Sequence, residues 1–237
     1  MLTKFMSYEE AAWCEAYLRG KDALNLFVSL KGSCQFIRRD VLEAVGGFDE
    51  GYLAEDMELS AKLARQGYRT KYAADVRALQ ESPSELKQLL RQRTRWYRGW
   101  MEVAFRYGSL MSSPSWMKVD AEATLLGPFI LIGSLASYLC GFLAFLAPAP
   151  VDSLWHVIMQ SSAVSALLAV ILGGLTLIWF SKPKRLSNLL WLPFLYCYCC
   201  LQAFIASYAA MLILLRRPRK WLKTDKKGSV SQSKLNL

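Results

Sequence analysis

The sequence predicts an α/β domain followed by a helical transmembrane region. Strand-like and helix-like segments alternate over residues 1–105, which is typical of an α/β domain. Beyond residue 120 the chain contains three long segments almost free of charged residues, at 123–147, 154–180 and 186–215. Each of them exceeds the roughly 20 residues that a helix needs to cross a bilayer.

The first part of the chain opens with a predicted amphipathic helix over residues 7–18, whose start has the pattern of a capping box. A second helix of about two turns follows Asp40, and a third spans about 56–66. Short apolar or alternating segments between these helices predict strands. The expected strands are 24–30, 34–37, 68–72 and 75–81.

A long helix is predicted over about residues 84–106. Its stretch Arg91–Trp100 holds four arginines and two tryptophans. In a helix, Gln92, Arg95 and Trp96 share one face. A guanidinium forms bidentate hydrogen bonds with phosphate oxygens and an indole offers a stacking surface, so this face suits a phosphorylated or sugar ligand. By spacing alone, a basic, aromatic helix lying on a membrane surface is the favoured alternative.

Two acidic residues, Glu55 and Asp56, lie at the predicted start of the third helix, where the helix dipole favours negative charge. Two roles are open for Asp56. It caps the helix, or it acts as a general base, which requires a partner hydroxyl within hydrogen-bond reach. As an isolated observation, the capping role is favoured.

The distribution of basic residues predicts how the chain lies in a membrane. The loop 148–153 lacks basic residues, whereas 181–186 is basic. The positive-inside rule places the first outside and the second in the cytoplasm, so residues 1–120 are cytoplasmic in a multi-pass protein of the cell membrane. Three full spans would then place the basic tail outside. Either the rule fails for the tail, or one apolar segment is re-entrant or interfacial. The third segment, which contains Pro193 and Gln202, is the candidate for the irregular one.

The excess positive charge is concentrated in the tail. Residues 1–120 hold 18 basic against 16 acidic residues, whereas residues 216–237 hold 8 against 1. A basic tail that follows a hydrophobic region favours anionic membrane lipid over nucleic acid as a partner. Three of the six cysteines cluster in an apolar stretch, and neither a metal site nor a disulfide framework is predicted from them.

Several motifs follow one another in a fixed order ahead of the hydrophobic segments. They are Gly32-Ser33, Val45-Gly46-Gly47-Phe48-Asp49, Glu55-Asp56 and Gln92-x-x-Arg95-Trp96. In this order they resemble the C-terminal half of processive, membrane-embedded family-2 glycosyltransferases, the group of cellulose, chitin, hyaluronan and poly-N-acetylglucosamine synthases. The resemblance covers residues 24–105 closely and the membrane region in kind. It implies that the α/β domain is part of a GT-A-type nucleotide-sugar transferase domain.

The resemblance implies a catalytic role for the acidic pair. Asp56 would be the general base that deprotonates an acceptor sugar hydroxyl, which then attacks the anomeric carbon of a nucleotide-activated sugar with inversion. Glu55 would stand beside it and tune the charge at the helix start. The family usually has Thr before this pair, where the chain has Ala54. This difference leaves the base in place.

The resemblance also implies which residues bind the substrates. Gln92 and Arg95 would hold the diphosphate of the donor, and Trp96 would stack under the acceptor sugar. Gly32 and Ser33 match the family's Gly-Ser segment, which lines the acceptor site. The implied ligands are a nucleotide-sugar donor and an acceptor glycan or lipid at the cytoplasmic face of the membrane.

A divalent metal, Mg²⁺ or Mn²⁺, is expected from the family, but its ligands are not expected in this chain. The family's D-x-D ligands lie upstream of the Gly-Ser segment, and here about thirty residues precede Gly32 without a D-x-D. A truncated or split enzyme is therefore expected, with a separate N-terminal half as a partner. Its parts would be the C-terminal part of a cytoplasmic transferase domain at 1–110, a transmembrane region at 121–215 and the basic tail at 216–237.

The same missing segment supports an alternative function. A chain without the donor and metal half of the active site could be a non-catalytic membrane subunit, either a channel or a scaffold derived from such a synthase. The motif order favours the enzyme.

Overall fold

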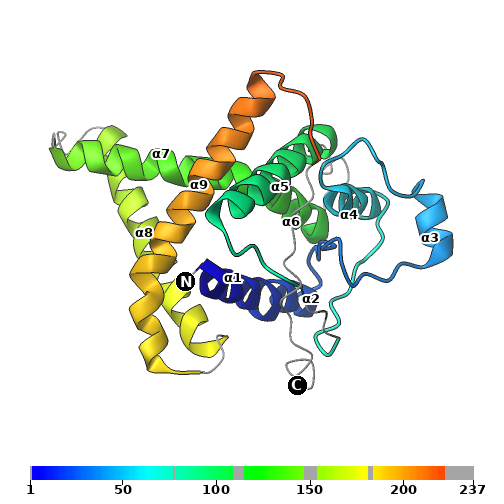
Figure 1. Cartoon of the computed structure of the whole chain (residues 1–237), viewed down its shortest axis with the longest axis horizontal. Helices are drawn as coiled ribbons and strands as arrows, with labels where there is room; N and C mark the ends of the chain where they lie inside the picture. Colours follow the sequence, from blue (N-terminus) through cyan, green and yellow to red (C-terminus); the bar gives the residue numbers. More distant parts are fainter. Residues whose placement is uncertain are drawn as a thin grey trace.

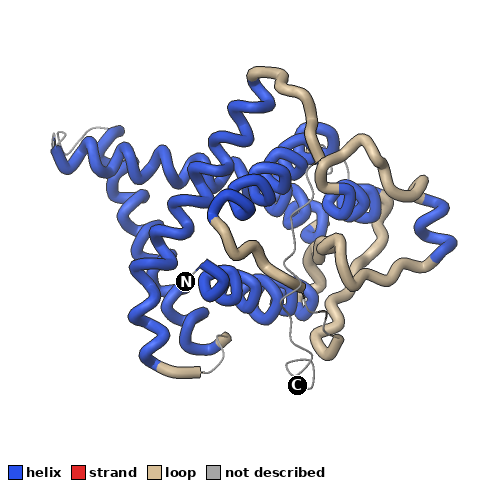
Figure 2. The backbone as a smooth tube through the Cα atoms, viewed as in Figure 1, coloured by secondary structure: helices blue, strands red, loops and turns tan. Residues whose placement is uncertain are grey.

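The computed structural model describes residues 2–76, 78, 80–108, 115–146, 154–180 and 184–221. Within these ranges the chain forms helices, turns and extended segments but no β-strand (Figure 2). The prediction of an α/β domain is therefore wrong, and so is the partial GT-A-type domain that the resemblance implied. The elements, shown in Figure 1, are α1 (Leu2–Ala11), the π-helix η1 (Ala12–Leu18), α2 (Arg19–Ala23), α3 (Arg39–Ala44), α4 (Glu55–Arg65), α5 (Leu86–Tyr107), α6 (Trp116–Leu125), α7 (Gly127–Leu146), α8 (Leu154–Trp179), the 3₁₀-helix η3 (Leu186–Trp191) and α9 (Leu192–Leu214).

The segments predicted as strands do not pair with one another in the described part of the chain. Backbone groups bond to side chains instead: Phe27 N–H donates to the Asp120 carboxylate at 2.9 Å, and Leu30 N–H donates to the Ser60 hydroxyl at 2.8 Å. An alternating sequence indicates an extended, half-buried chain, but a sheet also requires a neighbouring strand to complete its ladder. Positions 77 and 79 of the fourth predicted strand lie outside the described residues.

The N-terminal helix is longer than the predicted 7–18, because α1, η1 and α2 continue into one another from Leu2 to Ala23. Near its end the buried Lys21 contacts the Asp120 carboxylate at 2.9 Å and the Thr124 hydroxyl at 2.6 Å. A buried ammonium needs such partners. The pair therefore fixes α2 against α6.

Helices α4 and α5 approach each other closely at Gly99. A Cβ atom at Gly99 would lie 2.7 Å from Ala54 Cβ and 2.8 Å from Ala54 N, so this approach requires glycine. The buried side chains of Met57, Ala61 and Val103 belong to the core cluster that includes Ala54. Glycine at position 99 thus allows the start of α4 to lie directly against the arginine-rich helix.

Two helices are long and apolar enough to cross a membrane, namely α8 and the helix from Leu186 to Leu214 formed by η3 and α9. Helices α6 and α7 pass the same test together but are bent by 57°. The sharp bend therefore lies in the first apolar segment and not in the third, where Pro193 is accommodated in the first turn of α9. Several predicted connections lie outside the described residues, namely 112–114, 148–153, 181–183 and the tail beyond 221.

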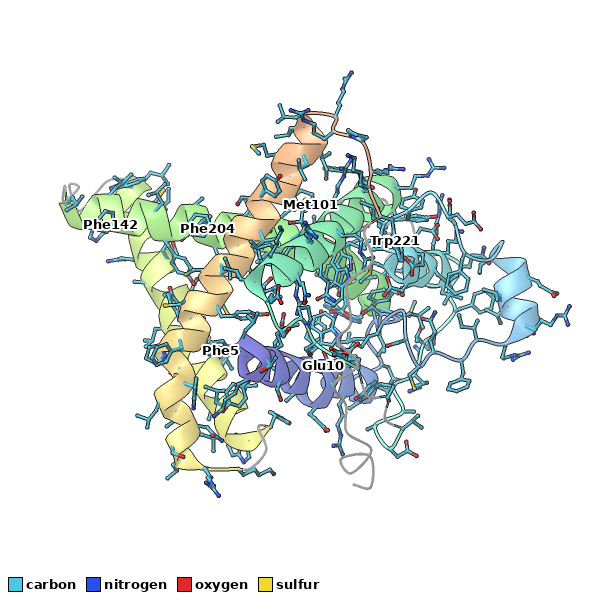
Figure 3. The ribbon with its side chains drawn as sticks, viewed as in Figure 1. Phe5, Glu10, Met101, Phe142, Phe204 and Trp221 are labelled. Atoms are coloured by element: carbon cyan, nitrogen blue, oxygen red, sulfur yellow. The ribbon has the colours of Figure 1, made fainter. Side chains whose placement is uncertain are left out.

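The apolar helices expose large side chains. Phe142 on α7 and Phe204 on α9 are each 60% exposed and lie away from the core (Figure 3). In Figure 1, α8 and α9 run along one side of the molecule and α7 crosses α9. Exposed apolar surface on this scale is typical of a membrane or protein contact.

After α9 the chain returns to α5 through residues 215–221, the C-terminal return segment. The buried Arg98 on α5 donates to the carbonyl oxygens of Arg217 at 2.6 Å and Pro218 at 3.1 Å. Glu102 on the same helix pairs with Arg98 and with Arg219, each at 3.0 Å. These contacts hold Trp221 near α4 and α5 (Figure 3).

Replacing Arg98 with alanine should free the C-terminal return segment. Each lost hydrogen bond to a charged donor is worth about 1.5–3 kcal/mol, so the segment should open at least tenfold more often. Limited trypsin digestion after Arg219, followed by mass spectrometry, measures this opening. Arg106→Ala, at an exposed position in the last turn of the same helix, is the control and should cleave at the wild-type rate.

Candidate functional site

Asp56 lies in the first turn of α4, beside Glu55. Ala54, and not Asp56, occupies the N-cap position, and it makes no side-chain capping bond. Asp56 Oδ1 accepts a hydrogen bond from the N–H of Met57 at 2.8 Å. The capping role that the sequence left open for Asp56 therefore does not hold.

The Asp56 side chain is half-buried, and the pKa of its carboxyl group is raised from 3.8 to about 6. Loss of hydration is the main cause, because burial disfavours the charged form. The Met57 N–H lowers the pKa, the neighbouring Glu55 charge raises it, and the Arg95 guanidinium lowers it. A carboxylate with a pKa near neutrality is suited to accept a proton from a hydroxyl group.

The raised pKa predicts opposite pH dependences for activity and stability. Activity that needs the Asp56 carboxylate should fall about tenfold per pH unit well below pH 6, as measured by a pH–rate profile. Because the folded pKa exceeds the unfolded value of 3.8, the folded state binds more protons between these values, so this group lowers stability as pH rises through 6. The cost at pH 7 is on the order of 2 kcal/mol. A stability profile of Asp56→Asn that keeps the wild-type slope would contradict this assignment.

The Gly32-Ser33 turn lies against Asp56. Gly32 has a φ of +71°, and a Cβ atom built there would lie 3.0 Å from Asp56 Oδ2. Both the left-handed backbone and the close approach require glycine at this position. Ser33 follows on the exposed side of the turn.

Arg95 interacts electrostatically with both members of the acidic pair. Its Nη1 donates to the backbone oxygen of Leu53 at 3.1 Å, just ahead of α4. Burial lowers the pKa of the guanidinium, whereas the charges of Glu55 and Asp56 raise it. The structure therefore brings Gly32, the acidic pair and Arg95 to one place, although these residues come from three separate parts of the chain.

Gln92 and Trp96, the other two predicted site residues of α5, lie in the same helix as Arg95. The predicted helix over about 84–106 is thereby confirmed. Gln92 is half-buried, and its Oε1 has no hydrogen-bond partner within the described part of the chain. The Arg93 guanidinium carbon lies 4.4 Å from the centre of the Trp96 ring, a cation–π contact. The Trp96 ring therefore has Arg93 against it in this structure.

Sequence reasoning missed three residues of this neighbourhood. Glu9 Oε2 on α1 accepts hydrogen bonds from Arg93 at 2.5 Å and from the Tyr198 hydroxyl at 2.8 Å. The guanidinium carbon of Arg95 lies 5.8 Å from the centre of the Trp221 ring. Arg93 was open to prediction because it is next to Gln92 in the sequence. Trp221 was open to prediction because it lies in the basic tail. Glu9 lies 84 residues before Arg93, and nothing in the sequence links the two.

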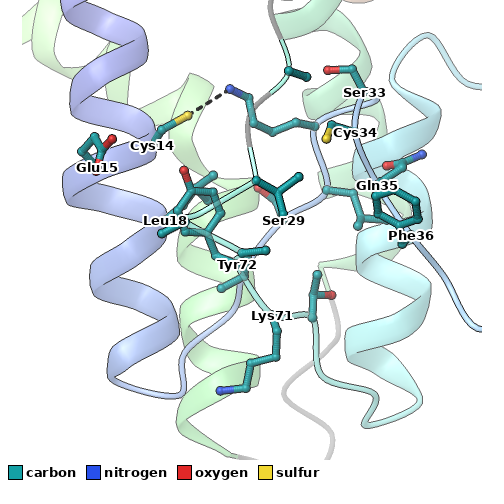
Figure 4. A pocket seen from close by; sticks show the side chains of 18 of the residues that line it. Cys14, Glu15, Leu18, Ser29, Ser33, Cys34, Gln35, Phe36, Lys71 and Tyr72 are labelled. Carbon is teal, nitrogen blue, oxygen red and sulfur yellow. Dashed lines mark hydrogen bonds between the residues drawn. The ribbon is translucent and has the colours of Figure 1, made fainter. Parts of the chain in front are cut away.

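A cavity of about 830 Å³ adjoins the Gly32-Ser33 turn, between the N-terminal helix and the extended segments (Figure 4). Ser33 and Gln35 line one side, and Cys14 lines the opposite side. Lys31 Nζ donates to Cys14 Sγ at 3.4 Å and also contacts the Glu10 carboxylate. The turn therefore contacts both this cavity and Asp56.

The residues around Asp56 do not fit a divalent metal. Across the described ranges, no group of three or more His, Cys, Asp or Glu side chains is placed to hold a metal ion. Glu55 and Asp56 instead have the Arg95 guanidinium as their neighbouring positive charge. We therefore derive no chemical step through a metal bound by these residues.

Comparisons with known proteins bear on this site. The model of the Glycosyl transferase family group 2 matches residues 1–214. A probable glycosyltransferase, YdaM, of Bacillus subtilis is 30% identical over 107 residues, which are 45% of this chain and 26% of that protein. A probable glucomannan 4-beta-mannosyltransferase of Oryza sativa is 23% identical over 229 residues, which are 91% of this chain and 38% of that protein.

A cellulose synthase catalytic subunit of Xanthomonas axonopodis is 41% identical over 73 residues, which are 31% of this chain and 10% of that protein. The chain thus spans well under half the length of these curated relatives. No solved structure matches the chain.

Proposed function

Because the chain belongs to the Glycosyl transferase family group 2, we propose that it transfers a sugar, with inversion, from a nucleotide-sugar donor to an acceptor glycan or lipid. The single observation that carries the proposal is the half-buried Asp56 carboxyl group, which lies against Gly32, interacts with the Arg95 guanidinium and has a raised pKa. Cellulose synthase and glucomannan mannosyltransferase relatives support a polysaccharide as the product.

In the proposed reaction, Asp56 accepts the proton of an acceptor hydroxyl. The hydroxyl oxygen then forms a bond to the anomeric carbon of the donor while the bond from that carbon to the diphosphate oxygen breaks. Attack opposite the leaving diphosphate inverts the configuration. Loss of hydration, with a smaller contribution from the Glu55 charge, keeps the pKa of Asp56 high, which makes its carboxylate a stronger base.

The remaining site residues have binding roles in this proposal. Arg95 and Gln92 hold the leaving diphosphate, since a guanidinium and an amide both donate to phosphate oxygens. Trp96 stacks against the acceptor sugar. Because the Arg93 guanidinium lies over the Trp96 ring, the sugar must either bind to the opposite face of the ring or displace Arg93. Gly32 and Ser33 bring the acceptor close to Asp56, because a glycine backbone leaves room beside the carboxylate.

The proposed location is the cell membrane, crossed more than once, with residues 1–120 in the cytoplasm. The two apolar helices that are long enough to span support it. We propose that residues 1–110 form a transferase part that ends in an interfacial helix. Residues 121–215 form a membrane region, and residues 216–237 form a basic tail that meets lipid headgroups. A separate N-terminal half is a proposed partner that supplies donor contacts and the ligands of a divalent metal, which family membership makes plausible in general.

The test is sugar incorporation from labelled UDP-glucose and GDP-mannose. Purified chain in lipid nanodiscs is assayed alone and then with the corresponding upstream segment of the Bacillus subtilis relative, each with Mg²⁺ or Mn²⁺. Incorporation that depends on Asp56 supports the proposal. Incorporation that is unchanged in Asp56→Asn would exclude Asp56 as the base.

A second candidate function is a non-catalytic membrane subunit, that is, a channel or scaffold. The observation that favours it is that, among the described residues, no group of three or more His, Cys, Asp or Glu side chains is placed to hold a metal ion. The same assay separates the two, because a subunit of this kind would neither bind nor turn over a nucleotide sugar under any condition.

A further inference from the structure

A second cavity, of about 380 Å³, lies between the N-terminal helix and the apolar helices. Its walls come from α1, η1, α5, α7, α8 and α9. Aromatic side chains dominate the part from the N-terminal helix and α5, namely Tyr8, Trp13, Tyr17 and Tyr97. Aliphatic side chains face them from the apolar helices, namely Leu131, Leu177 and Leu195.

The cavity contains one buried polar group without a protein partner. Gln202 on α9 is 4% exposed, and its Oε1 accepts a hydrogen bond from the Tyr97 hydroxyl at 2.8 Å. Its Nε2 has no partner within the part of the chain that the structure describes. A buried amide donor left unpaired is unfavourable, so this group favours a ligand that presents an oxygen atom.

The lining selects the kind of ligand. A sugar ring carries hydroxyl groups around its edge, and the aliphatic wall formed by Leu131, Leu177 and Leu195 would leave most of them unpaired. A hydrocarbon chain with one oxygen-bearing end satisfies both the aliphatic wall and the single amide donor. Two of the contributing helices, α8 and α9, are long and apolar enough to lie in a bilayer, which would supply such molecules.

We infer that this cavity binds one chain of a bilayer phospholipid, whose ester oxygen accepts a hydrogen bond from Gln202 Nε2. The inference rests on the proposed membrane location and not on the proposed sugar transfer. The bound chain would contact Glu9, which also lines the cavity and holds Arg93 at 2.5 Å. Arg93 in turn stacks on Trp96, which is proposed to bind the acceptor sugar. The lipid is therefore connected to Trp96 through Glu9 and Arg93.

The experiment uses the full chain in nanodiscs of phosphatidylethanolamine and phosphatidylglycerol that include phosphatidylglycerol with a photoactivatable diazirine on its acyl chain. Mass spectrometry of the peptides then locates the crosslinks. We expect a cluster on the cavity-lining positions Thr176, Leu195 and Cys199. Gly173→Trp fills the cavity and should reduce these crosslinks at least fivefold. Gly133→Trp, on α7 where a new side chain meets open space, should not.

A second variant tests the amide. Gln202→Leu keeps the volume but removes the Nε2 donor together with the oxygen that accepts from the Tyr97 hydroxyl, so it should weaken crosslinking while the protein stays monodisperse. Asp56→Asn should keep every lipid contact, which separates this inference from sugar transfer. Crosslinks unaffected by Gly173→Trp and spread evenly over exposed positions such as Leu168 and Leu172 would overturn the inference. Displacement of the crosslinks by a cello-oligosaccharide would also overturn it, in favour of a sugar site.

Discussion

Asp56→Asn should lower sugar transfer by about 10²–10⁴-fold, the usual contribution of a general base. Asparagine keeps the shape of the side chain and can still accept the hydrogen bond from the Met57 N–H, but it cannot take the proton of an acceptor hydroxyl. The measurement is incorporation of labelled sugar by membranes of the producing cells, with the substitution in the chromosomal copy. This setting retains whatever partner chain the enzyme requires.

The same substitution should increase stability. The neutral amide avoids the cost of a buried carboxylate, so the free energy of unfolding at pH 7 should rise by about 1–2 kcal/mol. Higher stability combined with lost activity is the pattern of a catalytic group and not of a structural one. Asp40→Asn is a matched control, because Asp40 is exposed in the first turn of α3 and pairs with the exposed Arg38; the substitution should leave activity unchanged and should not increase stability. Equal loss of activity in both variants would contradict the assignment.

The sequence was informative where one local pattern decides the structure. The helix predicted over about 56–66, with Gly67 just after its end, corresponds to α4, and the apolar spacing over about 84–106 corresponds to α5. Gly32-Ser33 was predicted as part of the motif order. Gly32 adopts a left-handed backbone conformation, which favours glycine at this position. These features depend on neighbouring residues, so one sequence is sufficient to predict them.

Features that depend on distant residues were not predictable. In the strand expected at 24–30, for example, the N–H groups of Phe27 and Leu30 bond to the side chains of Asp120 and Ser60, which belong to helices α6 and α4. Likewise, the bend between α6 and α7 lies at Leu126, beside Gly127-Pro128. The sequence instead predicts one uninterrupted apolar segment over 123–147. Alternation and apolar length describe a segment, whereas pairing and bending depend on what that segment packs against.

Gly99→Leu should lower the free energy of unfolding by about 3 kcal/mol and abolish transfer. A Cβ atom at position 99 already overlaps Ala54, so a leucine side chain must push α5 away from the start of α4. Thermal unfolding followed by fluorescence-detected size-exclusion chromatography measures the loss. Gly133→Leu is the control, because its side chain would meet open space. A Gly99→Leu protein that melts like wild type would show that the two helices are not in this contact.

The smaller substitution Gly99→Ala gives a sharper test, because it should leave the protein folded. Its Cβ would lie 2.8 Å from Ala54 N, so the first turn of α4 must move outward and admit water to Asp56. Hydration removes the main cause of the raised pKa, and the acid limb of the pH–rate profile should shift from about 6 toward 3.8. A residue that touches no substrate would then control the strength of the base through packing alone. An unchanged acid limb with lower activity would mean that Gly99 affects the site by some route other than the burial of Asp56.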